Sequence, residues 1–232
     1  MLWGLKPVEQ QAAYGLAVTR LKRQVHMGMV LPGERLPAER KLAEQMGLSR
    51  VTLREALRVL EAEGYISVKR GASGGAFVAQ EGPLREMALK RLGSDPSGVL
   101  RIFEYRAAVE PLAAQFSAVR RTPGDLRRLD EAISEIGKAT NAGELRRGEA
   151  AFHLAVAQAS ANPYISSSIE DALASLFMPL PHGSLAEQVA QSGLLRGNVV
   201  DAIRDRDQAK AEQRMKLVIE YEQARASDSK AA

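Results

Sequence analysis

The sequence predicts a mostly α-helical protein in which an N-terminal winged helix-turn-helix is followed by an all-helical bundle of six to seven helices. Two observations support this fold class. Early in the chain, two short amphipathic helical patterns precede two short runs with strand character. Later, helical periodicity recurs without an alternating strand pattern. We therefore expect a winged domain over residues 1–80, a connector with one short helix over 81–96, and a helical domain over 97–227.

The first part begins with a helical pattern over residues 14–28, and His26 near its end is expected at the surface. A second helical pattern ends at Gly47, where a helix C-cap is expected. Ser49 is suited to N-cap a third helix over about 50–63. Apolar residues recur along that helix at the spacing of a buried face, namely Leu53, Ala56, Leu57 and Leu60.

Arginines occupy a different face of this third helix. Arg50 and Arg54 are four residues apart, and Thr52 lies between them near the N-terminal end. Arginine can donate two hydrogen bonds to guanine, and hydroxyls can reach base edges or phosphates. The pattern therefore predicts a helix that enters the major groove of DNA.

A two-stranded ribbon is predicted next. Residues 65–68 and 77–78 have strand character, and the glycine-rich segment 71–75 between them is typical of a turn. Lys69 and Arg70 lie where the ribbon turns. Basic side chains would thus be available there to a DNA backbone or minor groove.

The charge distribution supports binding to nucleic acid. Residues 1–80 contain 12 Lys and Arg against 7 Asp and Glu, whereas the remainder contains 20 against 21. The basic excess therefore lies in the winged part, as neutralisation of phosphates requires. The absence of cysteine excludes disulfides and thiolate metal sites. Because there is also no apolar run that could cross a membrane and no secretory leader, we expect a cytoplasmic protein.

Residues 17–79 resemble the DNA-binding domain of the GntR superfamily of bacterial transcription regulators. The resemblance rests on LPAERKLAEQMGLSRVTLREALRVLEAEGYI followed by a basic residue and Gly. It implies DNA contacts from four arginines and two hydroxyl residues, namely Arg40, Arg50, Arg54, Arg70, Ser49 and Thr52. Lys69 and Gly71 complete the predicted DNA-binding set at the wing. The alternative is that the arginines form a solvated surface with salt bridges to Glu55 or Glu61.

The helical part resembles the ligand-sensing FCD domain of FadR-like GntR regulators. The resemblance rests on EYRAAVEPLAAQFSA at 104–118, T-P-x-D-L at 122–126, FHLAVAQASANPYI at 152–165 and VVDAIRDRDQAKAEQRM at 199–215. It implies a homodimer in which each sensing domain holds a small molecule inside its helical bundle, often beside a divalent metal.

The metal-binding pattern of that family is incomplete in this chain. Many members supply an aspartate and a histidine four residues apart, followed by two more histidines. Here Glu149 and His153 have that spacing, but Arg196 and Val218 stand at the other two positions. A guanidinium has no lone pair to donate, and one Glu with one His is a poor site for Zn²⁺. We predict no cofactor; Zn²⁺ at Glu149 and His153, with His182 as a third ligand, is the alternative.

An arginine in place of a metal ligand suggests a different way to bind an acid. Arg196 could hold a carboxylate or phosphate by two parallel hydrogen bonds, and Arg106, which shares a helix face with Glu110, is a second candidate. We predict an effector site made of Arg106, Glu149, His153 and Arg196, and a carboxylate effector. The alternatives are a surface role for Arg196, a hydrogen-bonded core role for His153, and a structural ion pair between Arg106 and Glu110.

The sequence contains little that supports an enzymatic function. The chain has no cysteine nucleophile, no G-x-S-x-G motif and no glycine-rich phosphate loop, since GASGG at 71–75 falls in the wing. We therefore predict a homodimeric DNA-binding transcription regulator, a repressor whose affinity for a palindromic operator is controlled by a small organic acid. The alternatives are a metal-dependent sensor or hydrolase that uses Glu149 and His153, and a constitutive dimeric DNA-binding protein without an effector.

Overall fold

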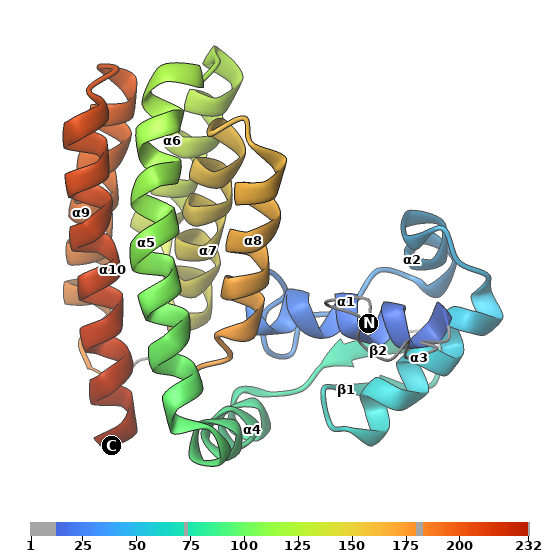
Figure 1. Ribbon diagram of the computed structural model, residues 1–232. Coiled ribbons are helices and arrows are strands. Elements are labelled where there is room, and N and C mark those ends of the chain that lie inside the picture. Colours follow the sequence, from blue (N-terminus) through green and yellow to red (C-terminus); the bar gives the residue numbers. More distant parts are fainter. Residues whose placement is uncertain (1–12, 72–73, 180–182, 232) are drawn as a thin grey trace, which may run out of the picture. The chain divides into compact units, whose positions relative to one another are not determined.

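Figure 1 shows the computed structural model of the chain, which describes residues 13–71, 74–179 and 183–231. Within this part the chain is mostly helical and contains one two-stranded sheet, as predicted. No described helix combines the length and the apolar character that crossing a lipid bilayer requires.

The described residues form two compact units. The first contains those up to 23 together with 33–79, and the second contains 24–32 and the residues from 80 onwards. The last boundary between the two units falls after residue 79. The short segment 24–32 is grouped with the helices, whereas the sequence places it inside the winged domain.

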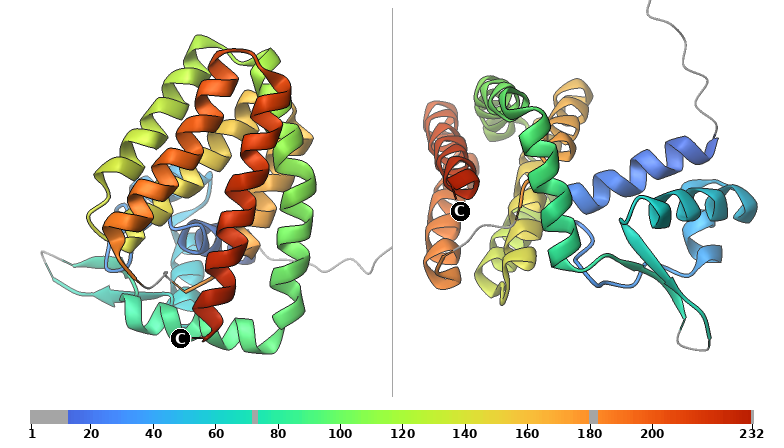
Figure 2. Two further views of the ribbon diagram at one scale, coloured as in Figure 1. Left: turned by 90° about the vertical axis from the view of Figure 1, so that its left-hand side faces the viewer. Right: turned by 90° about the horizontal axis from the view of Figure 1, so that it is seen from below.

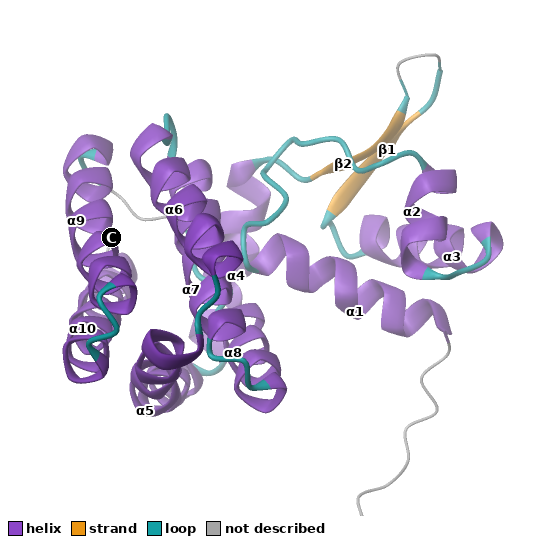
Figure 3. Ribbon diagram, turned by 90° about the horizontal axis from the view of Figure 1, so that it is seen from above, coloured by secondary structure: helices purple, strands orange, loops and turns teal. Residues whose placement is uncertain are grey.

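The winged unit is built from helices and one antiparallel hairpin. Its elements are α1 (Ala13–His26), α2 (Glu39–Met46), α3 (Arg50–Ala62), β1 (Ile66–Lys69) and β2 (Gly75–Val78). Figure 3 shows the two strands next to α2 and α3. The last residues of α1 belong to the other unit.

Local sequence explains the helix-turn-helix and the wing. Helix α2 ends at Gly47, whose left-handed φ of 66° suits glycine, and the Ser49 side chain caps α3. The buried face of α3 is the predicted one, Leu53, Ala56, Leu57 and Leu60. The strands pair with Ile66 opposite Val78 and Lys69 opposite Gly75, so Lys69 lies at the turn end of the wing.

The second unit contains a short helix before a bundle. Its helices are α4 (Glu81–Ser94), α5 (Pro96–Arg120), α6 (Pro123–Lys138), α7 (Ala142–Ala159), α8 (Pro163–Ser175), α9 (Leu185–Arg204) and α10 (Gln208–Ala231). Helix α10 packs against α5 and α9, and α6 packs against α7 and α9 (Figure 2). Within the described residues, these helices match the predicted six to seven.

Capping residues set the start of four helices in the bundle. The side chains that accept hydrogen bonds from the first turns of α6 to α9 are those of Thr122, Asn141, Asn162 and Ser184. At α6 the carboxylate of Asp125 also accepts from the Thr122 backbone N–H at 2.8 Å, which completes a capping box.

The interior of the bundle contains charged groups as well as apolar side chains. The largest wholly buried apolar residues include Leu129, Ile136, Phe152, Ile203 and Met215. Arg106, Glu110, His153 and Arg196 are buried among them. Burial of a charge is costly unless it is paired, so the partners of these four residues define the candidate site.

Candidate DNA interface and ligand cavity

The N-terminal end of α3 presents a basic and hydroxyl-rich surface. Arg50 and Arg54 are exposed, and Thr52 is partly exposed between them. Ser49 Oγ accepts a hydrogen bond from the Thr52 backbone N–H at 3.0 Å and lies 2.8 Å from Thr52 Oγ1. The two hydroxyls are therefore held together at the helix start, where they also stabilise α3.

Two of the predicted DNA-binding arginines make surface ion pairs. Arg54 lies 2.8 Å from a carboxylate oxygen of Glu39, and Arg40 lies 3.3 Å from one of Glu44. Both guanidinium groups stay solvent-accessible, and such exposed pairs contribute little to stability. Within the described residues, Arg50 makes no ion pair.

The acids named in the alternative interpretation have other partners. Glu55 pairs with Arg58 at 2.7 Å, and Glu61 accepts a hydrogen bond from the backbone N–H of Val68 at 2.9 Å. Among the described residues, none of the predicted DNA-binding arginines forms a salt bridge with Glu55 or Glu61.

The wing adds further exposed cations. Lys69, Arg70 and Gly71 are all exposed, and Lys69 Nζ lies 5.0 Å from the centroid of the Phe77 ring. Arg35, which the sequence analysis missed, lies near the same ring and donates a hydrogen bond to the carbonyl of Gly74. The sequence signal that could have identified Arg35 is its position as a basic residue shortly before the PAER segment.

A second residue that was missed lies on α3 itself. Val51 is 69% exposed and lies directly after Arg50 in the first turn of the helix. An exposed valine between two polar residues that are predicted to contact DNA is suited to contact the methyl group of thymine. Its place on the predicted basic face was the signal, because a core residue would have followed the spacing of Leu53 and Leu57.

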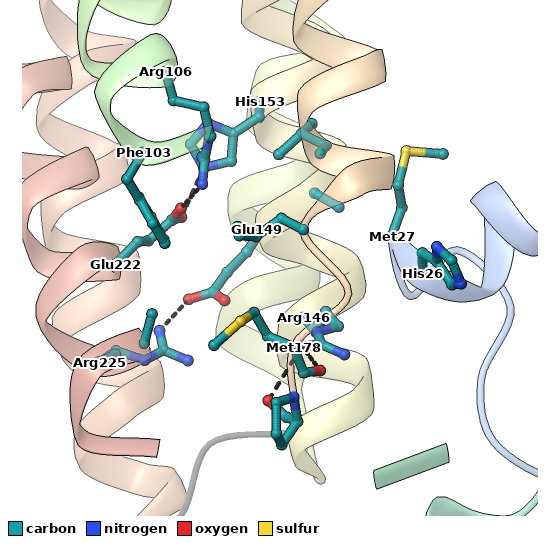
Figure 4. Close-up of a pocket in the computed structure, with 15 residues that line it drawn as sticks. His26, Met27, Phe103, Arg106, Arg146, Glu149, His153, Met178, Glu222 and Arg225 are labelled. Carbon is teal, nitrogen blue, oxygen red and sulfur yellow. Dashed lines mark hydrogen bonds and ion pairs between the residues drawn. The ribbon is translucent and has the colours of Figure 1, made fainter. Parts of the chain in front are cut away.

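The helical unit contains a cavity of about 110 Å³. One water molecule requires roughly 10–15 Å³ on this measure, so the cavity has room for a small organic molecule. Its charged lining residues are Arg106, Arg146, Glu149, His153, Glu222 and Arg225 (Figure 4). The predicted residues Arg106, Glu149 and His153 are among them, whereas Arg196 does not line the cavity.

Five of the surrounding side chains form a buried inner network: Arg106, Glu110, His153, Arg196 and Glu222. Glu110 pairs with Arg106 and accepts from His153 Nδ1. His153 Nε2 donates to Glu222 Oε1 at 2.8 Å, and Arg106 Nη1 lies 2.7 Å from Glu222 Oε2. The predicted ion pair between Arg106 and Glu110 is thus present, and Glu222 of α10 joins it to α7.

The inner network favours the protonated form of His153. Burial alone would lower the pKa of this imidazole, but Glu110 and Glu222 outweigh burial and raise the pKa above its usual 6.5. Burial likewise opposes ionisation of these two carboxyls, yet Arg106 and His153 hold both pKa values below the usual 4.5. Each ring nitrogen of His153 can therefore donate to a carboxylate.

Arg196 lies behind the carboxylates that line the cavity. It is wholly buried, so the alternative interpretation of Arg196 as a surface arginine is wrong. Its Nη1 donates to Ser192 Oγ at 2.7 Å and lies 3.5 Å from Glu149 Oε1, and its Nη2 pairs with Glu222. Arg196 therefore positions Glu149 and Glu222 rather than reaching into the cavity itself.

An outer cluster, made of Arg146, Glu149 and Arg225, lies next to the inner network. Arg225 Nη1 donates to Glu149 Oε1 at 2.7 Å. Arg146 Nη2 donates to two backbone carbonyls, those of Met178 and Pro179, the latter at 3.2 Å. Burial lowers the pKa of Arg146 to about 10, with a further reduction from Arg225 that Glu149 opposes, so its guanidinium remains charged at neutral pH.

The donor set does not fit a divalent metal. Both ring nitrogens of His153 are engaged by carboxylates, and Glu149 Oε1 accepts from Ser192 and Arg225. Arg196 adds a positive charge at the position of a metal ligand and has no lone pair. His182, the suggested third ligand, lies outside the described residues.

His26 also lies at the cavity, contrary to the expectation that it is a surface residue. It is buried, its Nδ1 donates to the carbonyl of Ala174 at 3.0 Å, and its ring stacks on Phe177 at 4.2 Å between centroids. Tertiary contacts with the end of α8 cause this burial, and no local pattern around His26 reports them. Together with Met27, it places the C-terminal end of α1 in the cavity wall.

Two family models match the chain. Residues 13–78 match the family described as bacterial regulatory proteins, gntR family, and residues 101–221 match the FCD domain. The Exu regulon transcriptional regulator of Escherichia coli (strain K12) is 30% identical over 163 residues, which cover 70% of this chain and 62% of that protein. The HTH-type transcriptional regulator LutR of Bacillus subtilis (strain 168) is 34% identical over 144 residues, 58% of this chain and 62% of LutR. The chain thus spans less than two-thirds of the length of both relatives.

A solved structure supports the fold. The E. coli protein McbR/YncC has a TM-score of 0.58 to this chain at 23% identity, and the match covers 94% of this chain and 99% of that one. At this level of identity the likeness concerns the arrangement of the backbone.

Proposed function

This chain belongs to the GntR family of bacterial regulatory proteins and contains an FCD domain, and from that premise we propose that it is a homodimeric transcription repressor controlled by a small organic acid. Its relatives are regulators rather than enzymes. One observation carries the proposal: the chain combines an exposed basic helix start in the winged unit with a charged cavity in the helical unit.

For the DNA-binding part, we propose that α3 enters the major groove. Arg50, Thr52 and Arg54 would contact base edges or phosphates there, and Val51 would contact thymine methyl groups. Arg40, Ser49 and the wing residues Lys69, Arg70 and Gly71 would contact the backbone or the adjacent groove. Their exposure and the basic excess of the N-terminal part support this assignment.

For the dimer, we propose that α5 supplies part of the contact between protomers. Tyr105, Leu112 and Val119 are seven residues apart along α5 and are exposed in the single chain. Residues at this spacing form one stripe, which a second copy could cover. A two-fold dimer would place two winged domains on two halves of a palindromic operator.

For the effector, we propose that a carboxylate ligand occupies the cavity and lowers affinity for the operator. Arg106, Glu149 and His153 would contribute to its wall, and Arg196 would hold Glu149 and Glu222 in place. The charged lining and the poor fit to a metal both support direct binding of an acid by arginine.

The test measures operator affinity with and without acids. The full chain is used to select a DNA site from a random pool, and its affinity for that site is measured by fluorescence anisotropy with each member of an organic-acid panel. We expect selective DNA binding that at least one acid weakens by about tenfold or more, a coupling of about 1.4 kcal/mol. Selective binding that no acid alters would support the constitutive alternative. If the chain binds all DNA sequences equally, the proposal that it is a transcription regulator is contradicted.

A further inference from the structure

We propose that Arg146, assisted by Arg225, holds the acid group of the effector, and that Glu149 and Glu222 select a ligand that carries hydroxyl groups. The ligand class is then a small hydroxy acid with a single negative charge. This inference rests on the proposed effector cavity, and it assigns the acid-binding role to an arginine that the sequence analysis did not consider.

The inner arginines are already neutralised by the chain itself. Arg106 pairs with Glu110 and Glu222, and Arg196 pairs with Glu222 while lying close to Glu149. Glu222 thus occupies the position between two guanidinium groups that a ligand carboxylate would need. An entering acid would have to displace a carboxylate that is tethered to α10, which disfavours binding at this place.

The outer cluster has a positive charge to spare. Arg225 pairs with Glu149, whereas within the described residues no carboxylate forms an ion pair with Arg146. The partners of Arg146 are neutral backbone carbonyls, both reached through Nη2. Its remaining N–H groups are donors that a ligand carboxylate can accept from.

The whole lining leads to the same conclusion. Three arginines and two glutamates line the cavity, so the formal charges of these five side chains sum to +1 without His153. The excess lies at Arg146 rather than at Arg106, because Arg106 pairs with both Glu110 and Glu222.

The two glutamates limit what else the ligand can contain. An ionised carboxylate only accepts hydrogen bonds, so Glu149 and Glu222 favour ligand groups that donate, such as hydroxyls. A second carboxylate on the ligand would meet these negative charges and be repelled. Apolar side chains complete the wall, including Phe103, Leu173 and Met178. A short carbon chain with hydroxyl groups satisfies all of these neighbours.

The test compares matched acids on the full chain by isothermal titration calorimetry. The hydroxy acids are lactate, glycerate and gluconate. The comparison probes are propionate, which has no hydroxyl, malonate, which has no hydroxyl and a second carboxylate, and lactamide, which has no charge. We expect at least one hydroxy acid to bind at least tenfold more tightly than all three of these probes. Propionate or malonate binding as tightly as the best hydroxy acid would overturn the proposal, and so would the absence of binding by every hydroxy acid.

Variants then locate the acid group. Arg146→Gln should weaken binding of that hydroxy acid at least tenfold, whereas Arg147→Gln, the neighbouring arginine that does not line the cavity, should leave it unchanged. Glu222→Gln should reduce the preference for the hydroxy acid over propionate, because an amide donates as well as accepts. Circular dichroism melts confirm that each variant folds. Equal affinities for Arg146→Gln and Arg147→Gln would overturn the assignment.

Operator affinity, measured in parallel, separates this inference from the proposed function. Selective DNA binding by a protein that binds none of the acids would reject the ligand class and leave the DNA-binding regulator intact. A hydroxy acid that binds through Arg146 without altering operator affinity would support the ligand site and reject effector control.

Discussion

The pH dependence of the buried charged network comes mainly from the protonation of His153. Its two ring nitrogens donate to Glu110 and Glu222, and these carboxylates raise its pKa above the usual 6.5. In the unfolded chain the imidazole returns to its ordinary pKa. The folded protein therefore binds the proton more tightly than the unfolded protein does, and folding is linked to pH.

This linkage has a defined sign. The stabilisation from His153 is complete below about pH 6.5 and is lost as the pH rises through the raised pKa of the folded state. Urea unfolding at a series of pH values above 6.5 should show a falling free energy of unfolding in the native chain. The same decline should be much smaller in His153→Gln. A native chain whose stability is independent of pH across this window would contradict the protonated imidazole.

Arg50 and Arg40 should differ in what they contribute to DNA binding. Arg50→Ala should cost about 1–3 kcal/mol of discrimination between the selected site and scrambled DNA, because a bidentate contact with a base is lost. Arg40→Ala should weaken binding to both DNAs to a similar extent, as loss of a phosphate contact does. Anisotropy titrations on the two DNAs measure this. Equal losses on both DNAs for Arg50→Ala would show that it does not contact a base.

Residues within one helix were easier to predict as partners than residues on different helices. The four-residue spacing of Arg106 and Glu110 predicts their contact, which is present. Glu222 contacts His153 across 69 positions of sequence, and Arg146 contacts Pro179 across 33. Such partners depend on which helices pack together, and periodicity within each helix contains no information about that.

At the scale of the element, α6 and α7 approach each other closely at a glycine. A Cβ atom added to Gly148 of α7 would lie 2.8 Å from Ile136 Cγ1 and 3.0 Å from the Ile136 backbone nitrogen of α6. These distances are too short for a methyl group, and backbone atoms cannot rotate away. The glycine therefore lets the two helices pack at this separation.

Alanine substitutions at two glycines should distinguish the effect of helix packing on stability from the effect of helix propensity. Gly148→Ala should destabilise the protein by about 1–3 kcal/mol, because overpacking forces α6 and α7 apart. Gly197→Ala is the matched control: it lies inside α9 with no neighbouring atom near the added Cβ, and should gain up to about 1 kcal/mol of helix propensity. Urea unfolding of both variants measures the difference. A stabilised Gly148→Ala would show that α6 and α7 can move apart at no cost.

Helix starts were predictable because capping is local. Thr122 and Asn162 lie next to prolines at the first helical position, and both cap helices where the sequence indicates. The burial of His26 was not predictable, because it results from packing on Phe177 and Ala174, about 150 residues later in the chain. Short-range chemistry sets where a helix begins, and long-range packing sets which of its faces is buried.

At the scale of the whole molecule, the exposed stripe on α5 predicts the oligomeric state. Leu112→Lys should shift the protein from dimer to monomer, since a charge in the centre of an apolar contact must be desolvated. Sedimentation velocity of the native and variant chains measures this directly. Leu194→Lys, at an exposed leucine on α9, is the control and should leave the dimer intact. A variant at Leu112 that sediments like the native dimer would place the interface elsewhere.

The division of α1 has a consequence for exchanging parts between regulators. The segment 24–32 interrupts the winged unit in sequence and belongs to the helical unit, where His26 and Met27 line the cavity. A chimera joined once, at residue 80, would therefore pair the cavity of one parent with a piece of wall from the other. Three crossover points, near residues 23, 32 and 79, are needed to transplant the DNA specificity of one protein onto the intact sensor of another.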